Sequence, residues 1–106
     1  MNKKIDTKVK QIINKIINNN DMFTIFGLST CIYCKKTLNL LKNKNLQFKY
    51  YDMDKYHQFF IKFLYKINEL KPNFNIDLTH DTFPVIFYNQ KFIGGFDELN
   101  NYLTHT

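Results

Sequence analysis

The spacing of hydrophobic residues near the start of the chain predicts a helix followed by a strand. Between residues 6 and 19, apolar side chains recur every three to four positions and form one stripe, made of Val9, Ile12, Ile13, Ile16 and Ile17. Asp6 or Thr7 precedes this stripe and is expected to cap the N-terminus of the helix. Residues 22–26, Met-Phe-Thr-Ile-Phe, are rich in β-forming side chains and predict a short strand.

The middle of the chain predicts two further helices separated by a second strand. Residues 27–30 form a turn, and residues 31–45 have helical spacing, with Leu38 and Leu41 on the buried side and Leu40 at its edge. Residues 46–53 predict the strand. A long helix capped by Asp54 should end near Lys71, because a proline disfavours helical geometry in the residue before it. Its wide apolar face is expected to contain Tyr56, Phe59, Phe60, Phe63, Leu64, Ile67 and Leu70.

The last third of the chain predicts a hairpin and a closing helix. Residues 73–81 are polar and irregular, residues 84–95 carry two apolar runs around Asn89-Gln90, and residues 96–104 form a short helix. The predicted order is αβαβαββα. The first two strands are joined by a helix and should be parallel, whereas the hairpin must be antiparallel. We therefore expect an α/β fold, a mixed four-stranded sheet with helices on both faces, in a single domain over residues 1–106.

Composition and charge narrow the class of protein. The chain has 106 residues, 44% of them hydrophobic, which suits one compact domain. No apolar run approaches the roughly 20 residues of a membrane span, and residues 1–21 lack the features of a secretory signal. We expect a protein of the reducing cytoplasm, without a membrane segment. The net charge of +6 comes from scattered lysines without a single arginine, which favours a solvated basic surface over a nucleic-acid interface.

The two cysteines, Cys31 and Cys34, stand three positions apart and admit four interpretations. They could form a structural disulfide, half of a zinc site, a reactive dithiol, or two unrelated buried thiols. A reducing compartment disfavours the structural disulfide, and an exposed turn before Cys31 disfavours inert core thiols. A zinc site needs about four ligands, and the remaining candidates, His57, His80 and His105, are far apart in sequence. These histidines are expected to be ordinary surface residues.

The position of Cys31 favours the reactive dithiol. Cys31 lies where the first strand leads into a helix, and the unpaired N–H groups and dipole of a helix N-terminus stabilise a thiolate. Cys34 follows one helical turn later, a separation that suits a disulfide. A C-x-x-C beside a βαβ pattern in an intracellular chain is typical of a thioredoxin-like redox centre.

Three motifs in order resemble those of the glutaredoxin family over nearly the whole chain. The C-x-x-C after the first strand is shared with the wider thioredoxin-like superfamily. Thr82-Phe83-Pro84 resembles the family's T-V-P, in which the proline follows a cis peptide bond, and residues 93–99, Ile-Gly-Gly-Phe-Asp-Glu-Leu, resemble its I-G-G-Y-D-D-L. A helix before the first strand is a further trait of the family.

The resemblance implies a glutathione-dependent thiol–disulfide oxidoreductase with Cys31 as nucleophile and Cys34 as resolving thiol. Its implied glutathione groove is lined by Tyr33, Phe83, Pro84, Gly95, Phe96 and Asp97. The backbone of Phe83 would pair with the cysteinyl part of glutathione, Gly95 would allow close approach, and Asp97 would hold the γ-glutamyl end. Without the resemblance, the two glycines could be only a turn and Asp97 only a helix cap.

Three departures from the family pattern keep other functions open. Leu28 stands where many members have a lysine, Ile32 replaces the usual proline after the first cysteine, and residues 71–81 look longer than usual. Some glutaredoxins hold a [2Fe–2S] cluster between two monomers, ligated by the first cysteine and bound glutathione, and members without that proline do so more often than the others. The resemblance therefore makes cluster binding one alternative. A thioredoxin-type enzyme, reduced by a reductase instead of glutathione, is another. For the leading hypothesis we expect a monomer whose clients are glutathionylated or disulfide-containing proteins, with ribonucleotide reductase as one example.

Overall fold

The computed structural model describes residues 3–105, with side chains from Asp6 onward, and its elements follow the predicted order. The α-helices and strands are α1 (Lys3–Asn18), β1 (Phe23–Gly27), α2 (Ile32–Asn43), β2 (Phe48–Asp52), α3 (Phe60–Leu70), β3 (Val85–Tyr88), β4 (Lys91–Gly94) and α4 (Phe96–Thr104). Two 3₁₀ helices, η1 (Asp54–Phe59) and η2 (Pro72–Phe74), precede and follow α3.

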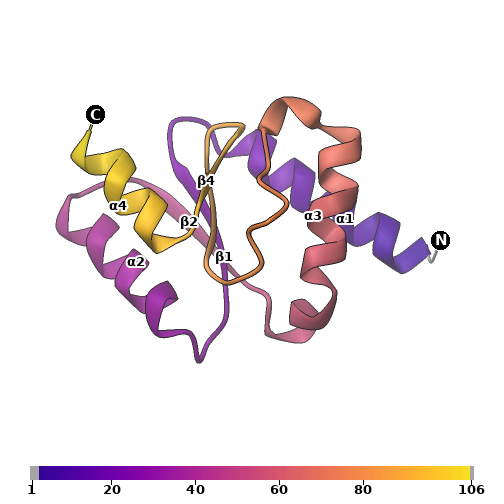
Figure 1. Ribbon diagram of the computed structural model, residues 1–106, viewed down its shortest axis with the longest axis horizontal. Coiled ribbons are helices and arrows are strands. Elements are labelled where there is room, and N and C mark those ends of the chain that lie inside the picture. Colours follow the sequence, from indigo (N-terminus) through magenta and orange to yellow (C-terminus); the bar gives the residue numbers. More distant parts are fainter. Residues whose placement is uncertain (1–2, 106) are drawn as a thin grey trace.

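The four strands form one mixed sheet in the order β2-β1-β3-β4. Strand β1 pairs in parallel with β2 and antiparallel with β3, and β3 pairs antiparallel with β4. Helices α1 and α3 cover one face of the sheet, and α2 and α4 lie on the other side of it (Figure 1). The predicted fold class is therefore confirmed.

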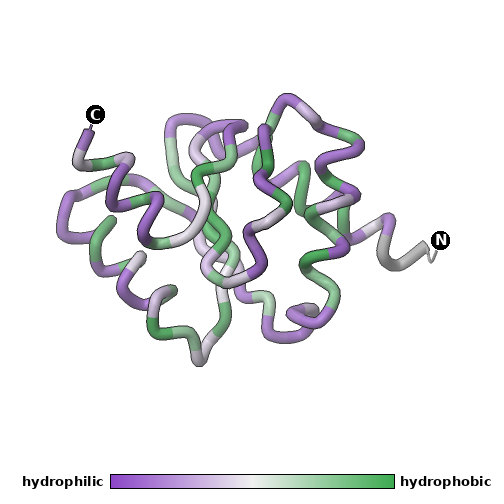
Figure 2. The backbone as a smooth tube through the Cα atoms, in the orientation of Figure 1, coloured by the Kyte–Doolittle hydropathy of each residue, from purple (hydrophilic) through white to green (hydrophobic). Residues whose placement is uncertain are grey.

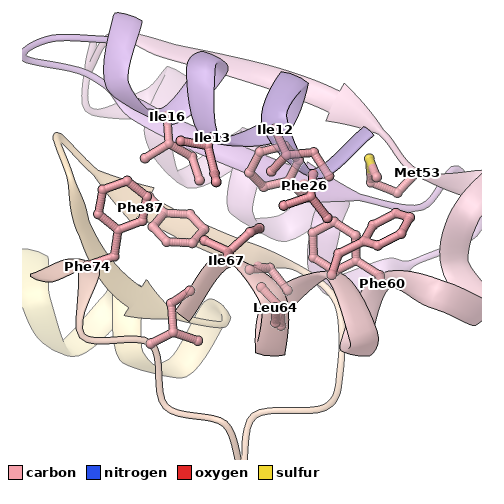
Figure 3. Close-up of a cluster of buried hydrophobic side chains, with 14 residues drawn as sticks. Ile12, Ile13, Ile16, Phe26, Met53, Phe60, Leu64, Ile67, Phe74 and Phe87 are labelled. Atoms are coloured by element: carbon pink, nitrogen blue, oxygen red, sulfur yellow. The ribbon is translucent and has the colours of Figure 1, made fainter. Parts of the chain in front are cut away.

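The larger of the two hydrophobic cores lies between the sheet and the helices α1 and α3. The apolar stripe of α1 faces Phe60, Leu64 and Ile67 of α3, and the rings of Phe26 and Phe87 from the sheet fill the space between them (Figure 3). The Phe26 ring is tilted against that of Phe60, with centroids 5.5 Å apart, and meets that of Phe87 edge-on, with centroids 6.2 Å apart. Aromatic packing of this kind fixes the central strands laterally.

The second core lies on the opposite face of the sheet. Phe23 and Ile25 of β1 and Ile86 of β3 pack there against Leu41 of α2 and Leu99 of α4. Because side chains alternate between the faces of a strand, β1 contributes to both cores, and all five of its residues are buried. The hydropathy trace shows the apolar positions concentrated in the central strands and alternating along the helices (Figure 2). Within residues 3–105, no helix is long and apolar enough to cross a bilayer.

Two predicted helix caps are wrong. Asp6 and Thr7 lie inside α1, which is already helical at Lys3. Asp54 begins η1 instead of capping one long helix, and its side chain bonds to the loop before Cys31, as described below. The 3₁₀ turn separates Phe59 from the face of α3, and Phe59 and Leu70 are exposed, contrary to prediction, while Phe60, Phe63, Leu64 and Ile67 are buried.

The segment of residues 73–81 is irregular, as predicted, but it is not a wholly polar surface loop. Phe74 is fully buried and Ile76 nearly so. The Phe74 ring contacts that of Phe87 edge-on, with centroids 6.0 Å apart. Since Pro72 ends α3 and η2 turns the chain back over the sheet, this segment closes the end of the larger core.

We expect Phe74→Ala to destabilise the fold by about 3–5 kcal/mol, the usual effect of deleting a buried phenylalanine side chain. Phe59→Ala is the matched control, because the Phe59 side chain is 43% exposed. Urea denaturation followed by circular dichroism measures both free energies of unfolding. Equal losses in the two variants would contradict the placement of Phe74 in the core.

Candidate active site

Cys31 occupies the N-cap position of α2. Its backbone is extended, with φ −86° and ψ 115°, and its Sγ accepts a hydrogen bond from the N–H of Cys34 at 3.1 Å. The first N–H groups of a helix have no partner within the helix, and a side-chain acceptor at the N-cap satisfies one of them. A sulfur in this role is better stabilised as a thiolate than as a thiol, because the N–H groups and the helix dipole favour negative charge.

Cys34 has a different environment from Cys31, which is only partly buried. Cys34 is 1% exposed, and both thiols are free in the structure. Burial, followed by the hydrogen bond between the two sulfurs, raises the pKa of Cys34 to about 12. Cys34 is therefore a protonated donor at neutral pH, and Cys31 is the sulfur that accepts.

Gly27 and Tyr50 form the wall behind Cys34. A Cβ atom on Gly27 would lie 2.9 Å from the Cys34 Sγ and 2.7 Å from the Tyr50 hydroxyl, so only glycine fits there. The hydroxyl donates to the Leu28 carbonyl at 3.4 Å, and that carbonyl also accepts from the N–H of Cys31 at 3.2 Å. Burial, and then the nearby Cys34, raises the pKa of Tyr50 to about 12, which keeps its hydroxyl a donor.

The loop before Cys31 is anchored to η1 by a carboxylate. Asp54 accepts from the N–H of Ser29 at 2.9 Å through one oxygen and from the Ser29 hydroxyl through the other. These two donors hold the pKa of Asp54 below its usual range. The side chain predicted to cap a helix instead fixes the turn that presents Cys31.

The third strand carries a second backbone segment to Cys31. Val85 lies opposite Phe26 in the antiparallel register, so the residues just before β3 reach the end of β1 where Cys31 follows. The Phe83–Pro84 peptide is cis, as predicted. The Phe83 ring packs on Phe60, with centroids 5.3 Å apart, while its carbonyl lies 3.6 Å from the Cys31 Sγ.

The start of α4 forms the facing wall. Gly94 has a φ of 125°, which disfavours other residues, and Gly95 is the N-cap. The Glu98 carboxylate accepts from the Gly95 N–H at 2.8 Å, which satisfies one donor at this helix start. Asp97 lies in the first turn with its side chain exposed.

These segments enclose a pocket of about 350 Å³. All six residues expected to bind glutathione line it, together with His80, Thr82 and Glu98. The rings of Tyr33 and Phe96 form one rim, with centroids 5.9 Å apart. Phe83 connects the pocket to the nucleophile, because it lines the pocket and its carbonyl contacts the Cys31 sulfur. The structure thus brings the predicted residues together, and the binding roles given to them stay predictions.

Sequence reasoning missed three residues of the pocket, Thr82, Glu98 and His80, although Thr82 belongs to the Thr82-Phe83-Pro84 motif. Glu98 stands three positions after Gly95, and this capping-box spacing was visible in the sequence. His80, expected to be an ordinary surface residue, has a side chain that is only 13% exposed and lines the pocket. Its place depends on how the chain from Phe74 onward packs, which no local pattern reveals.

The residues of the site do not supply a metal centre by themselves. Among the described residues, no group of three or more histidine, cysteine or acidic side chains is placed to hold a metal ion. A [2Fe–2S] cluster needs four cysteine or comparable ligands, and this chain offers Cys31 beside a buried Cys34. The remaining cluster ligands would have to come from another molecule. The residues of a single chain therefore do not suffice to hold a [2Fe–2S] cluster.

Comparisons with known proteins agree with this geometry. A family model described as Glutaredoxin matches residues 23–93. The chain is 35% identical over 81 residues to a probable glutaredoxin of Acanthamoeba polyphaga mimivirus, covering 76% of each chain. It is 30% identical over 91 residues to glutaredoxin-2 of Schizosaccharomyces pombe, covering 86% of this chain and 74% of that one.

A solved structure resembles the whole fold. The buckwheat glutaredoxin–glutathione complex superposes with a TM-score of 0.66 at 18% identity, covering 99% of this chain and 87% of that chain. At this level of identity the likeness concerns the fold alone. With the family model spanning both cysteines and the hairpin, the chain belongs to the glutaredoxin family of thiol–disulfide oxidoreductases.

Proposed function

We propose that the chain uses glutathione to reduce protein disulfides and protein–glutathione mixed disulfides. The observation that carries this proposal is a pair of unequal thiols joined to the pocket through Phe83: Cys31 accepts a hydrogen bond and contacts the Phe83 carbonyl, while Cys34 is buried and protonated. The buckwheat neighbour, which has the same fold, was crystallised with glutathione.

The pocket has the chemistry to bind glutathione beside Cys31. Glutathione is a short peptide, so its cysteinyl part can pair with the backbone next to Pro84 as an added strand does. Its γ-glutamyl end carries an ammonium and a carboxylate. The exposed carboxylate of Asp97 can accept from the ammonium, and the N-terminus of α4 favours the carboxylate.

Deglutathionylation needs Cys31 alone. Its thiolate attacks the glutathione sulfur of a mixed disulfide, the sulfur–sulfur bond breaks, and the protein leaves as a thiolate that takes up a proton. A second glutathione thiolate then attacks the glutathione sulfur of the Cys31 adduct, which forms oxidised glutathione and regenerates Cys31. Glutaredoxins have reduction potentials near −200 to −230 mV, so the glutathione pool can supply these electrons.

Reduction of a protein disulfide also needs Cys34. Attack by Cys31 joins it to one protein sulfur and releases the other. The Cys34 sulfur then attacks Cys31, which frees the protein and leaves a Cys31–Cys34 disulfide for two glutathiones to reduce. Burial is the main cause that raises the pKa of Cys34, and the hydrogen bond and the charge of Cys31 raise it further. Both disappear once Cys31 is in a mixed disulfide, so Cys34 loses its proton more easily when it is needed.

The test is reduction of a glutathionylated protein with glutathione, glutathione reductase and NADPH as the electron supply. We expect turnover by the wild-type chain and none by Cys31→Ser. Cys34→Ser should keep deglutathionylation and lose most of the reduction of protein disulfides, because glutathione replaces the resolving thiol only for the first reaction. Activity supported by thioredoxin reductase but not by glutathione would favour the thioredoxin-type alternative instead.

Alkylation should separate the two thiols. At mildly acidic pH, limiting iodoacetamide is expected to label Cys31 first, because the pKa of Cys34 is raised to about 12 and a thiol that keeps its proton reacts slowly. Labelling of Cys34 should grow only as the pH is raised far into the alkaline range. Peptide mapping by mass spectrometry measures both rates, and faster labelling of Cys34 would invalidate the assignment of the nucleophile.

Asp97→Ala is expected to raise the KM for a glutathionylated peptide by about threefold to tenfold with little change in kcat, the effect of losing one solvent-exposed, charge-assisted contact. Asp81→Ala is the matched control, because Asp81 is also exposed but does not line the pocket. Steady-state kinetics on both variants gives the comparison. Equal KM values in the two variants would mean that Asp97 does not contact the substrate.

A further inference from the structure

His80 connects the two walls of the pocket. Its Nε2 lies 3.2 Å from the carbonyl oxygen of Pro84, on the wall that comes before β3. Its Nδ1 lies 4.0 Å from the carboxylate of Glu98, on the wall formed by α4. The same carboxylate oxygen accepts from the N–H of Gly95, so a chain of polar contacts runs from one wall through the imidazole to the other.

The imidazole is held firmly in this place. Its side chain is 13% exposed. The ring meets that of Phe92 edge-on, with centroids 5.5 Å apart, and its Cε1 lies 3.0 Å from where a Cβ on Gly95 would be. A side chain at position 95 would push the ring away, so the glycine serves the packing of His80 as well as the approach of a ligand.

The contacts of the two ring nitrogens determine how protonation of the imidazole changes its interactions with the pocket walls. A carbonyl can only accept, so Nε2 carries a proton and donates to Pro84. In the neutral ring Nδ1 is then a bare acceptor that faces a carboxylate, an arrangement without an attractive hydrogen bond. When Nδ1 gains a proton, the ring becomes a cation that donates to the Pro84 carbonyl and is attracted to the Glu98 carboxylate 4.0 Å away. Protonation of His80 therefore adds an attraction to Glu98 to the hydrogen bond with Pro84, and the imidazole then bridges the two walls of the pocket.

We propose that His80 is a positioning residue for the glutathione pocket: in its protonated form it ties the Pro84 carbonyl to the Glu98 carboxylate and holds the walls at the spacing that binds the ligand. This inference rests on the proposed function. It predicts that binding tightens as the pH falls through the range from about 5 to 8 in which histidine side chains change charge.

The other charged groups around His80 do not explain such a change. Glu98 and Asp97 face it from α4, and Asp77 and Asp81 lie on its own segment, where the His80 N–H donates to the Asp77 carbonyl. Carboxylates ordinarily titrate below this pH range. The pKa of Asp77 is lowered further, mainly by its bonds to Thr79. Phe92, on β4, carries no charge.

The experiment measures the dissociation constant of S-methylglutathione by isothermal titration calorimetry at about pH 5.5 and about pH 8, two conditions that span histidine titration. The probe has no thiol, and the Cys31→Ser background removes the titration of the nucleophile. We expect binding to be about threefold tighter at the lower pH, the size of one partly exposed ion pair. The His80→Gln variant should bind S-methylglutathione equally at both pH values, with the weaker affinity that the parent has at the higher pH.

Two variants complete the test. Glu98→Gln should also abolish the pH dependence, because glutamine can still accept from the Gly95 N–H but offers no charge to the imidazole, and it leaves His80 in place. His57→Gln is the matched control and should behave like the parent, since His57 is exposed on η1, outside the pocket. Thermal unfolding establishes that each variant is folded.

The outcomes separate this inference from the proposed function. If the parent does not bind S-methylglutathione at either pH, the proposed function fails and this inference fails with it. If the parent binds but is insensitive to pH, or if the pH dependence survives in both His80→Gln and Glu98→Gln, only the role of His80 is overturned. Loss of the pH dependence in both variants, with its retention in His57→Gln, supports the bridge.

Discussion

The hydrogen bond from the Cys34 N–H to the Cys31 sulfur is the contact on which the site depends. It makes the Cys31 sulfur the N-cap acceptor of α2, a position that satisfies a free N–H of the helix and would also stabilise a thiolate. Because Cys34 stands one turn into that helix, the orientation that exposes Cys31 turns Cys34 toward the sheet. One local geometry therefore explains why Cys31 is partly exposed while Cys34 is buried.

That geometry is useful only if the loop before α2 keeps its position. Strand β1 is buried along its whole length between β2 and β3, and it fixes where the loop begins. Beyond it, the Leu28 carbonyl binds the Cys31 N–H and the Tyr50 hydroxyl, and the Ser29 N–H binds Asp54. The backbone of the loop thus has fixed hydrogen-bond partners, and the sulfur lies beside the Phe83 carbonyl.

The sequence predicted most of the fold because its information there is local. The stripe of α1, the β-forming residues of β1 and the turn at Asn89 are each set by neighbours a few positions away. The six pocket residues were found through motifs, which carry three-dimensional information that spacing alone lacks. The errors concern residues whose partners are distant: Asp54 bonds to Ser29, Phe74 packs on Phe87, and His80 reaches Glu98. Such pairings arise only when the chain has folded, so a helix cap or a polar loop was the natural expectation for each.

Leu28, three positions before Cys31, brings no charge to the site. Lysines follow the dithiol, but the Lys36 ammonium lies over the Tyr33 ring, 4.9 Å from its centroid, in a cation–π contact on the rim. The facing wall carries the carboxylates of Asp97 and Glu98. The Cys31 sulfur accepts a hydrogen bond from the backbone N–H of Cys34, at 3.1 Å. A donor held this close by a helix is screened by salt far less than a mobile surface cation, whose influence falls off within about 8–10 Å at ordinary ionic strength. The donor that the structure places at the Cys31 sulfur therefore belongs to a helix start, whose position depends on the fold.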